Sequence, residues 1–327
     1  MLQRTASAAS PVNFVVLVTT LSAPLLRQAA ADAAGGQQYP VGALYVVATP
    51  IGNLADLTLR AIHVLGLVDA IACEDTRHSA VLLRQLGIAK PLLALHAHNE
   101  RGASELVCAR LARGERVACI TDAGTPGISD PGALLVAAVR DAGHRIVPIP
   151  GASSAVAALS VAGAADTEGF RFAGFLPARG AERQRALDRI AHDPPTTTVL
   201  FEAPHRIAAL LEALAAAMPE RTVTVGRELT KQFETIETLS ARALPAWLAS
   251  DPNRARGEFV VVLHGAGGDG APDEPARHDA MLRTLLAELP LRQAASLAAA
   301  LSGASKNALY ARALELQSQE RERDGRD

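Results

Sequence analysis

The sequence predicts a two-domain α/β protein with a small helical tail, and three observations lead to that prediction. With 327 residues and 49% hydrophobic content, the chain is long and apolar enough for about two folded cores. From residue 43 to residue 150, short apolar runs alternate with segments of helical spacing, which is typical of a mainly parallel sheet. After Pro150 and Gly151 the apolar runs have fewer helices between them, which indicates a mixed α+β domain.

The first forty residues have a different character. Residues 12–26 are mostly apolar and follow Arg4, as in a secretory signal, but the run is too short and interrupted to span a membrane. The chain has three cysteines with no pairing pattern, which favours a reducing compartment. We therefore predict a cytoplasmic protein in which residues 1–40 form a disordered extension, or else come from a start codon that was set too early.

Residues 41–150 are expected to form the first α/β domain, which carries the cofactor and acceptor loops. Asn53 or Asp56 can cap the helix that follows its first strand. The pair Pro131-Gly132 opens a later helix, over residues 133–142. The strands of this domain are predicted at residues 44–48, 70–73, 92–95, 117–120 and 146–149.

Residues 151–265 are expected to form the second domain, with strands at residues 170–176, 197–201, 223–227, 235–239 and 258–263. A linker rich in Gly, Pro and Asp then leads to a helical tail within residues 266–327. Residues 291–316 have the spacing of a helix-turn-helix, whose second helix carries Lys306 and could contact RNA phosphates. A helical hairpin that only packs on its own domain fits the same spacing.

Three loops rich in Gly, Pro and hydroxyl residues each follow a predicted strand. They span residues 49–53, 120–132 and 150–154, and all are expected at the edge of the parallel sheet where ligands bind. Glycine there lets a ligand approach the backbone, because no Cβ intervenes. Neither a P-loop nor the G-x-G-x-x-G fingerprint is present, so a nucleoside triphosphate or dinucleotide has little support.

Several short motifs along residues 41–265 together resemble the tetrapyrrole methylase superfamily, and within it the branch that methylates RNA of the small ribosomal subunit. They read LYVVATPIGNL from Leu44, EDTR from Glu74, HNE from His98, ITDAGTPGISDPG from Ile120 and PGASS from Pro150. In the second domain they read GFLP, FEAPHR, RELTK and GEFV, in that order along the chain.

The resemblance implies a homodimeric enzyme with a tetrapyrrole methylase-like fold that binds S-adenosylmethionine between its domains. Its substrate would be the ribose 2′-hydroxyl of a decoding-centre cytidine in 16S rRNA. The superfamily's Gly-Asp-Pro loop corresponds to Gly124-Thr125-Pro126, so a threonine replaces the acid and Asp122 or Asp130 would supply the acidic contact. The cofactor-binding candidates are Pro50, Gly52, Asp122, Ala123, Gly124, Thr125, Gly127, Ser129, Pro150, Gly151, Ser153 and Ser154.

Methyl transfer from a sulfonium needs alignment and a group that handles the hydroxyl proton, but no metal. We take Asp75 as the first catalytic candidate, with Arg77 holding a phosphate, and Glu74 and Glu100 as further candidates. The same EDTR motif also fits a helix cap with an ion pair in the first turn. His96, His98 and Glu100 could line one side of a strand end, but no further cluster completes a metal site.

RNA contacts are expected from polar and basic residues of both domains and of the helical tail, although a net charge of −2 gives no global attraction to nucleic acid. An ion-pair network between domain elements is the alternative for those in the second domain. Two other functions remain open: a methyltransferase acting on a small tetrapyrrole, and a non-catalytic RNA-binding factor. The RNA-binding candidates are Asn53, His98, Asn99, Arg206, Arg227, Lys231 and Lys306.

Overall fold

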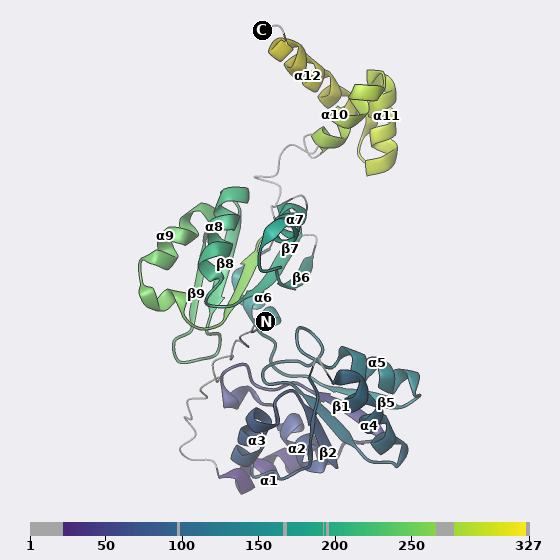
Figure 1. The fold of residues 1–327 in the computed structure, drawn as a ribbon, viewed down its shortest axis with the longest axis vertical. Helices are drawn as coiled ribbons and strands as arrows, with labels where there is room; N and C mark the ends of the chain where they lie inside the picture. The colour runs from purple at the N-terminus through teal and green to yellow at the C-terminus, as the bar shows by residue number, and fades with distance from the viewer. Residues whose placement is uncertain are drawn as a thin grey trace, which may run out of the picture. The chain divides into compact units, whose positions relative to one another are not determined.

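The first sheet has five strands, and every strand pair in it is parallel. A computed structural model describes residues 22–96, 99–165, 169–191, 193, 196–265 and 278–324. The strands of the first sheet are β1 (Ala43–Val47), β2 (Ala70–Cys73), β3 (Leu92–Ala94), β4 (Val117–Ile120) and β5 (Arg145–Ile149), in the order β3-β2-β4-β1-β5. Figure 1 labels β1, β2 and β5. The predicted parallel sheet is confirmed.

Helices cover both faces of this sheet, which explains why its central strands are continuously apolar. On one face, Tyr45 and Ile71 pack with α2 (Leu59–Leu67) and α3 (Thr76–Gln85). On the other face, Leu44 and Cys119 pack with α4 (Glu100–Ala112) and α5 (Ala133–Asp141). The cap of α2 differs from the prediction: the Thr58 side chain accepts from the Ala61 amide, whereas Asn53 caps the short 3-10 turn Leu54–Asp56.

The prediction of disorder before residue 40 was wrong for part of the segment. Helix α1 (Ala23–Ala34) packs beside α2, and Ala30 and Ala34 are buried. The Tyr39 hydroxyl donates to the Ala34 carbonyl at 3.0 Å. The helix exists because its alanine side is buried against the first core, a tertiary contact that composition alone does not reveal. Residues 1–21 lie outside the described residues.

The second sheet is mixed, as predicted. In the described part of the chain, strands β6 and β7 are parallel, and the other three neighbouring pairs of this sheet are antiparallel. One face packs against α7 (Gly180–Ala191), α8 (Ile207–Ala217) and α9 (Leu244–Ala249), and the other against α6 (Ser154–Ala162). Its strands are β6 (Phe170–Phe175), β7 (Thr197–Glu202), β8 (Thr222–Arg227), β9 (Thr235–Ser240) and β10 (Phe259–Leu263), in the order β6-β7-β10-β8-β9.

The chain divides into two compact units, of which the first holds both sheets. The second holds α10 (Asp279–Glu288), α11 (Leu291–Ser302) and α12 (Lys306–Asp324), packed around Leu282, Ala298 and Leu309. Gly303, in a left-handed conformation, ends α11. The two helices predicted within residues 291–316 are therefore present, as α11 and the first part of α12. Most of the predicted linker lies outside the described residues.

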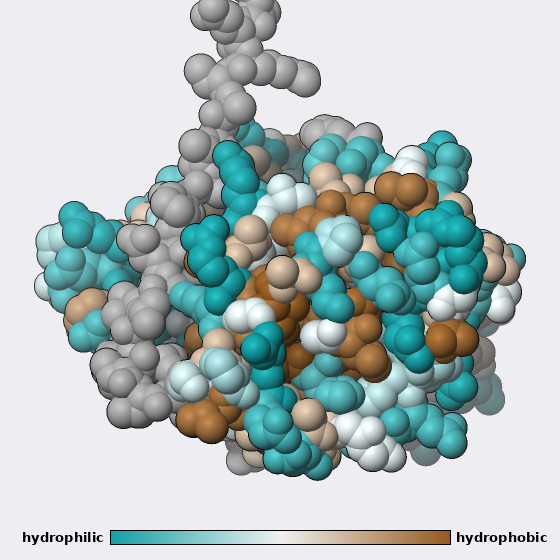
Figure 2. Space-filling model, turned by 90° about the horizontal axis from the view of Figure 1, so that it is seen from below, coloured by the Kyte–Doolittle hydropathy of each residue, from teal (hydrophilic) through white to brown (hydrophobic). Residues whose placement is uncertain are grey.

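The surface mixes polar and apolar residues, as Figure 2 shows for the face seen from below. Exposed large apolar side chains in the first domain include Leu25, Val41, Leu59 and Leu106, and scattered exposure of this kind is normal. In the part of the chain that the structure describes, none of the helices is long and apolar enough to cross a membrane.

Candidate functional site

The three Gly/Pro loops lie side by side, because they follow β1, β4 and β5, which are neighbours in the sheet. The amide of Thr49 donates to the Gly124 carbonyl at 2.9 Å, and the Gly124 amide donates back at 3.1 Å. The Thr125 hydroxyl donates to the Ala152 carbonyl at 3.1 Å, which joins the third loop to the second. The predicted meeting of these loops at one sheet edge is therefore what the structure shows.

Glycine is required at this edge for two physical reasons. Gly124 and Gly127 have φ values of 84° and 77°, in the left-handed region that other residues rarely adopt. Gly151 has ordinary backbone angles, but a Cβ there would lie 2.9 Å from the Cβ of Ala48. The loops consequently present backbone rather than side chains, which suits a ligand held by amides and carbonyls.

The family resemblance implies that these loops bind S-adenosylmethionine, so substituting Gly124 with valine should lower that affinity at least tenfold. The substitution forces a β-branched residue into a left-handed conformation, which costs about 1–3 kcal/mol, and it strains the loop that pairs with Thr49. Calorimetric titration measures the affinity. Gly143→Val is the matched control, since Gly143 has a similar φ of 77° and open space around it but ends α5 away from the loops. Equal affinities for the two variants would contradict a role of the loop in binding.

Acidic side chains line the same edge. Glu74 follows β2 and Asp122 follows β4, which are adjacent strands, and the Asp75 amide donates to Asp122 Oδ1 at 3.3 Å. Burial, together with the carboxylates of Asp130 and Asp122, raises the pKa of Glu74 to about 7. Burial also raises the pKa of Asp122 and of Asp130, and the carboxylates of Asp122 and of Glu258, which directly precedes β10, add to the effect on Asp130. The edge therefore holds several half-buried carboxyl groups that repel one another and favour a cationic ligand.

Asp75, our first catalytic candidate, has a different environment from Glu74. It is the N-cap of α3, where Oδ1 accepts from the Arg77 amide at 2.8 Å and Oδ2 pairs with Arg77 Nη2 at 2.8 Å. Hydrogen bonds from the Arg77 side chain and amide lower the pKa of Asp75 to about 2. This is the capped ion pair that the motif also allowed, and a carboxylate of so low a pKa is a weak proton acceptor.

Glu100 is buried and holds the start of α5. Its Oε1 accepts from the amides of Gly132, Leu134 and Leu135, at 2.8, 3.0 and 3.4 Å. Gly132 occupies the N-cap position of α5 but has no side chain with which to cap it, so the carboxylate of another helix does so. Glu100 therefore holds the end of the 120–132 loop in place by binding the backbone amides at the start of α5.

The remaining predicted polar residues have different environments. Asn99 binds its own loop, accepting from the His96 amide at 2.8 Å and donating to the Ala94 carbonyl at 3.0 Å. Ser153 is the N-cap of α6, but its side chain makes no capping bond, and Ser129 is exposed. His98 lies outside the described residues. Among the residues that the structure does describe, no group of three or more His, Cys, Asp or Glu side chains could hold a metal ion.

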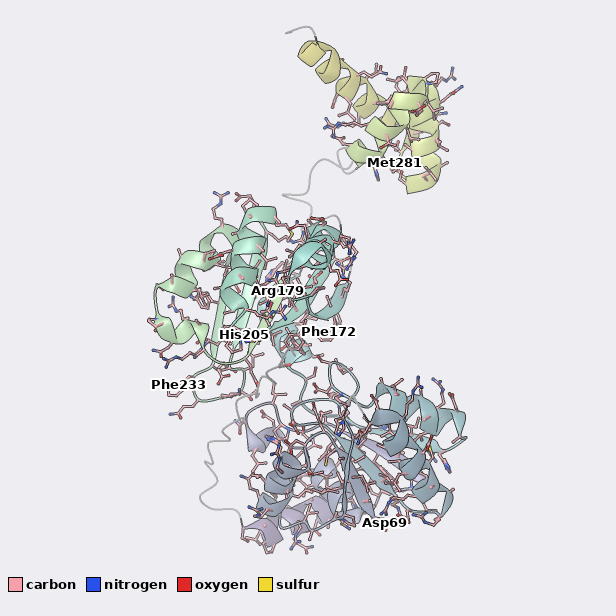
Figure 3. All side chains as sticks on the ribbon, in the orientation of Figure 1. Asp69, Phe172, Arg179, His205, Phe233 and Met281 are labelled. Atoms are coloured by element: carbon pink, nitrogen blue, oxygen red, sulfur yellow. The ribbon has the colours of Figure 1, made fainter. Side chains whose placement is uncertain are left out.

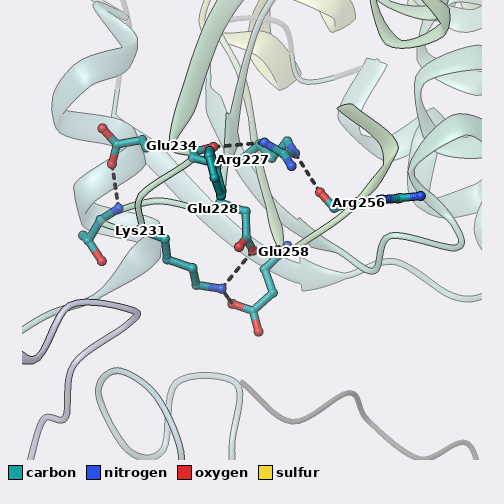
Figure 4. Close-up of polar contacts among 8 residues, drawn as sticks. Arg227, Glu228, Lys231, Glu234, Arg256 and Glu258 are labelled. Carbon is teal, nitrogen blue, oxygen red and sulfur yellow. Dashed lines mark hydrogen bonds and ion pairs between the residues drawn. The ribbon is translucent and has the colours of Figure 1, made fainter. Parts of the chain in front are cut away.

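The RELTK segment of the second sheet reaches the loop that follows β1. Lys231 Nζ contacts Glu228 Oε1 at 2.8 Å and Glu258 Oε2 at 3.0 Å (Figure 4). A Cβ on Gly52 would lie 2.4 Å from Lys231 Cγ, so only glycine allows this approach. Burial alone would lower the pKa of Lys231, but the two glutamates raise it, so the ammonium stays charged. The structure thus brings together Gly52 and Lys231, which sequence reasoning assigned to different roles.

Arg206 serves the fold of the second domain rather than an open surface. Its Nε lies 3.0 Å from Glu202 Oε1, and its Nη2 donates to the Leu176 carbonyl at 2.6 Å. The Glu202 side chain is fully buried, and Arg183 contacts its other oxygen at 3.5 Å. This is the ion-pair network that we considered as the alternative to RNA contact. Lys306, by contrast, is exposed at the start of α12.

Two comparisons with known proteins bear on this arrangement. The family model described as tetrapyrrole (corrin/porphyrin) methylases matches residues 43–245. The chain belongs to the tetrapyrrole methylase family. A family member named ribosomal RNA small subunit methyltransferase I, from Escherichia coli O157:H7, is 47% identical over 279 residues, which cover 84% of this chain and 96% of that protein. The resemblance inferred from the short motifs is confirmed.

Further members of the tetrapyrrole methylase family extend the comparison. The protein of the same name from Pseudomonas aeruginosa is 48% identical over 281 residues, covering 84% of this chain and 98% of that protein. A second model, the RsmI C-terminal HTH domain, matches residues 272–317, which include α10, α11 and the start of α12. The solved structure of the cobalamin biosynthetic enzyme cobalt precorrin-4 methyltransferase shares the fold, with a TM-score of 0.50 and 17% identity over 69% of this chain and 98% of that one.

Proposed function

We propose that the chain transfers a methyl group from S-adenosylmethionine to the ribose 2′-hydroxyl of a decoding-centre cytidine in 16S rRNA. The observation that carries the proposal is the joining of the three backbone-presenting loops with the half-buried carboxyl groups at one sheet edge. The names of relatives 47% and 48% identical to the chain support the choice of RNA as substrate.

The residues at this edge fit S-adenosylmethionine, a nucleoside that carries a positive sulfonium. Bound there, it would supply an activated methyl group for displacement. The backbone of the Gly124 and Gly151 loops would hold its polar groups, and Asp122 and Asp130 would lie near its positive charge. Because the demethylated product is a neutral thioether, it would lose this attraction, which favours its release.

Glu74 is the residue that we propose accepts the hydroxyl proton. A general base works best when its pKa lies near the working pH, and the Glu74 carboxyl meets this condition while Asp75 does not. Asp75 would then fix the start of α3, next to Asp122. The Arg77 side chain, which is 90% exposed, would contact the phosphates of RNA. Of the two adjacent carboxylates, Glu74 would thus accept the proton and Asp75 would cap the helix.

A homodimer, which the family resemblance implies, and a cytoplasmic location, which the cysteine usage favours, complete the proposal. Light scattering over a hundredfold range of protein concentration measures the mass of the particle. We expect twice the mass of the 34.1 kDa chain throughout that range. A particle of the single-chain mass would remove the dimer from the account without affecting the proposed reaction.

A methyltransferase acting on a small tetrapyrrole is the second candidate, and the fold of cobalt precorrin-4 methyltransferase favours it. The two candidates are separated by offering labelled S-adenosylmethionine with 30S subunits, with protein-free 16S rRNA and with a tetrapyrrole macrocycle. We expect label in RNA alone. Label in the macrocycle alone would overturn the proposal.

A further inference from the structure

Phe233 is the most exposed large apolar side chain of the described residues, at 70% exposure. It lies on the loop that joins β8 and β9, where Figure 3 labels it. Exposure of a whole aromatic ring to water is unfavourable, and a single such residue needs no explanation when its loop is loose. The loop that carries Phe233 is not loose.

Hydrogen bonds hold this loop at several points. Arg227 Nη1 donates to the Phe233 carbonyl at 2.9 Å, and the Thr230 amide donates to Glu234 Oε2 at 2.6 Å (Figure 4). Glu228 and Thr230 have φ values of 51° and 67°, which are uncommon outside glycine and persist only where the surroundings impose them. The aromatic ring is therefore carried by a backbone of fixed shape.

Arg227 holds the backbone on which this ring stands. The same guanidinium that binds the Phe233 carbonyl also donates, through Nε, to the Arg256 carbonyl at 2.7 Å. Arg227 therefore ties the backbone of Phe233 to the backbone of Arg256, and both residues are exposed. We call Phe233, Arg227 and Arg256 the aromatic–arginine patch.

The aromatic–arginine patch borders the candidate site. Lys231, two residues before Phe233, lies against Gly52 in the loop after β1, and its ammonium contacts Glu258. Glu258 in turn acts on the pKa of Asp130 at the acidic edge. Aromatic rings beside arginines are what proteins use to hold single-stranded nucleic acid, by stacking on a base and pairing with its phosphate.

We propose that Phe233 stacks on an unpaired nucleobase of the RNA substrate, and that Arg256 binds the adjoining phosphate. This inference rests on the proposed function, since it names the part of the RNA that the chain holds next to the reacting ribose. A base stacked outside the site would fix the strand while the reacting nucleotide reaches the acidic edge. Phe233 is thus a substrate-positioning residue.

The test compares Phe233→Ala with Phe170→Ala, which removes another exposed phenylalanine, 55% exposed, at the other edge of the second sheet. We expect Phe233→Ala to raise the KM for the RNA substrate about tenfold, as for the loss of one base–aromatic stack, with kcat and cofactor affinity unchanged. Phe170→Ala should leave all three at the wild-type values. An unchanged KM for Phe233→Ala, or an equal rise in both variants, would overturn the inference.

Phe233→Trp gives an independent readout. It should retain the wild-type KM, and its fluorescence should be quenched when RNA binds, because a base stacks on the indole. The chain has one natural tryptophan, Trp247, which is 9% exposed and donates to Glu237 Oε2 at 3.1 Å, so it adds a constant background. Absence of quenching would contradict stacking. Absence of methyl transfer to RNA by the wild type would overturn the proposed function, and this inference with it.

Discussion

Glu74→Gln should reduce methyl transfer by about 10²–10⁴-fold while affinity for S-adenosylmethionine stays within about twofold. The amide has the shape of the carboxylate but cannot accept the hydroxyl proton. Single-turnover transfer measures the first quantity and calorimetry the second. Asp75→Asn is the matched control, because asparagine also caps helices and Asp75 is held by Arg77 rather than by the acidic edge. A larger loss for Asp75→Asn than for Glu74→Gln would restore Asp75 as the proton acceptor.

The pH dependence gives the same prediction a second measurement. Because the ionised Glu74 is the active form and its pKa is about 7, the wild-type rate should rise through neutral pH and level off above it. The effect on stability has the opposite sign. The ordinary pKa of a glutamate is 4.5, and the pKa of Glu74 in the folded protein is about 7. Between these two pH values, the folded state keeps a proton on Glu74 that the unfolded state has lost, so the free energy of unfolding falls as pH rises. Glu74→Gln should therefore unfold at a higher temperature than the wild type at pH 8.

Glu100→Ala should lower the free energy of unfolding by about 3 kcal/mol and weaken cofactor binding together with it. The substitution leaves the amides of Gly132 and Leu135, which are buried, and of Leu134 without their acceptor. It also removes the negative charge that favours the start of a helix. Chemical denaturation measures the first effect.

Glu105→Ala is the control for this substitution. Glu105 lies on the same helix, α4, but is exposed, so its loss should change the free energy of unfolding by less than about 0.5 kcal/mol. If the two variants were equally stable, the role of Glu100 in holding the 120–132 loop would be contradicted.

The central strands of the first sheet could be predicted from the sequence because each is a short apolar run bounded by Gly, Pro or polar residues. The four-residue strand Val117–Ile120 is an example, since it is buried along its whole length and ends at the loop that starts with Thr121. Helix α1 could not be predicted in the same way. Its alanines stabilise the helix only because they pack against α2, a partner that lies some thirty residues along the chain.

The site could be predicted as a set of loops but not as a set of roles. Glycines after parallel strands locate the ligand edge whatever the ligand is. The difference between Glu74 and Asp75 depends on the burial of Glu74 and on the hydrogen bonds from Arg77 to Asp75, which two adjacent acids in a sequence do not reveal. The helix cap that Glu100 provides joins residues about thirty positions apart, which the sequence does not indicate. The role proposed for Phe233 depends on the fixed shape of its loop, which Arg227 holds by a contact that the sequence does not show either.

The measurement that tests the central claim most directly is the position of the transferred methyl group. 30S subunits that lack small-subunit ribose methylation are incubated with labelled S-adenosylmethionine and the chain, and the RNA is digested and analysed by mass spectrometry. The account predicts label in one 2′-O-methylcytidine of the decoding centre. Label on a base, or no label in RNA despite measurable binding of S-adenosylmethionine, would contradict it.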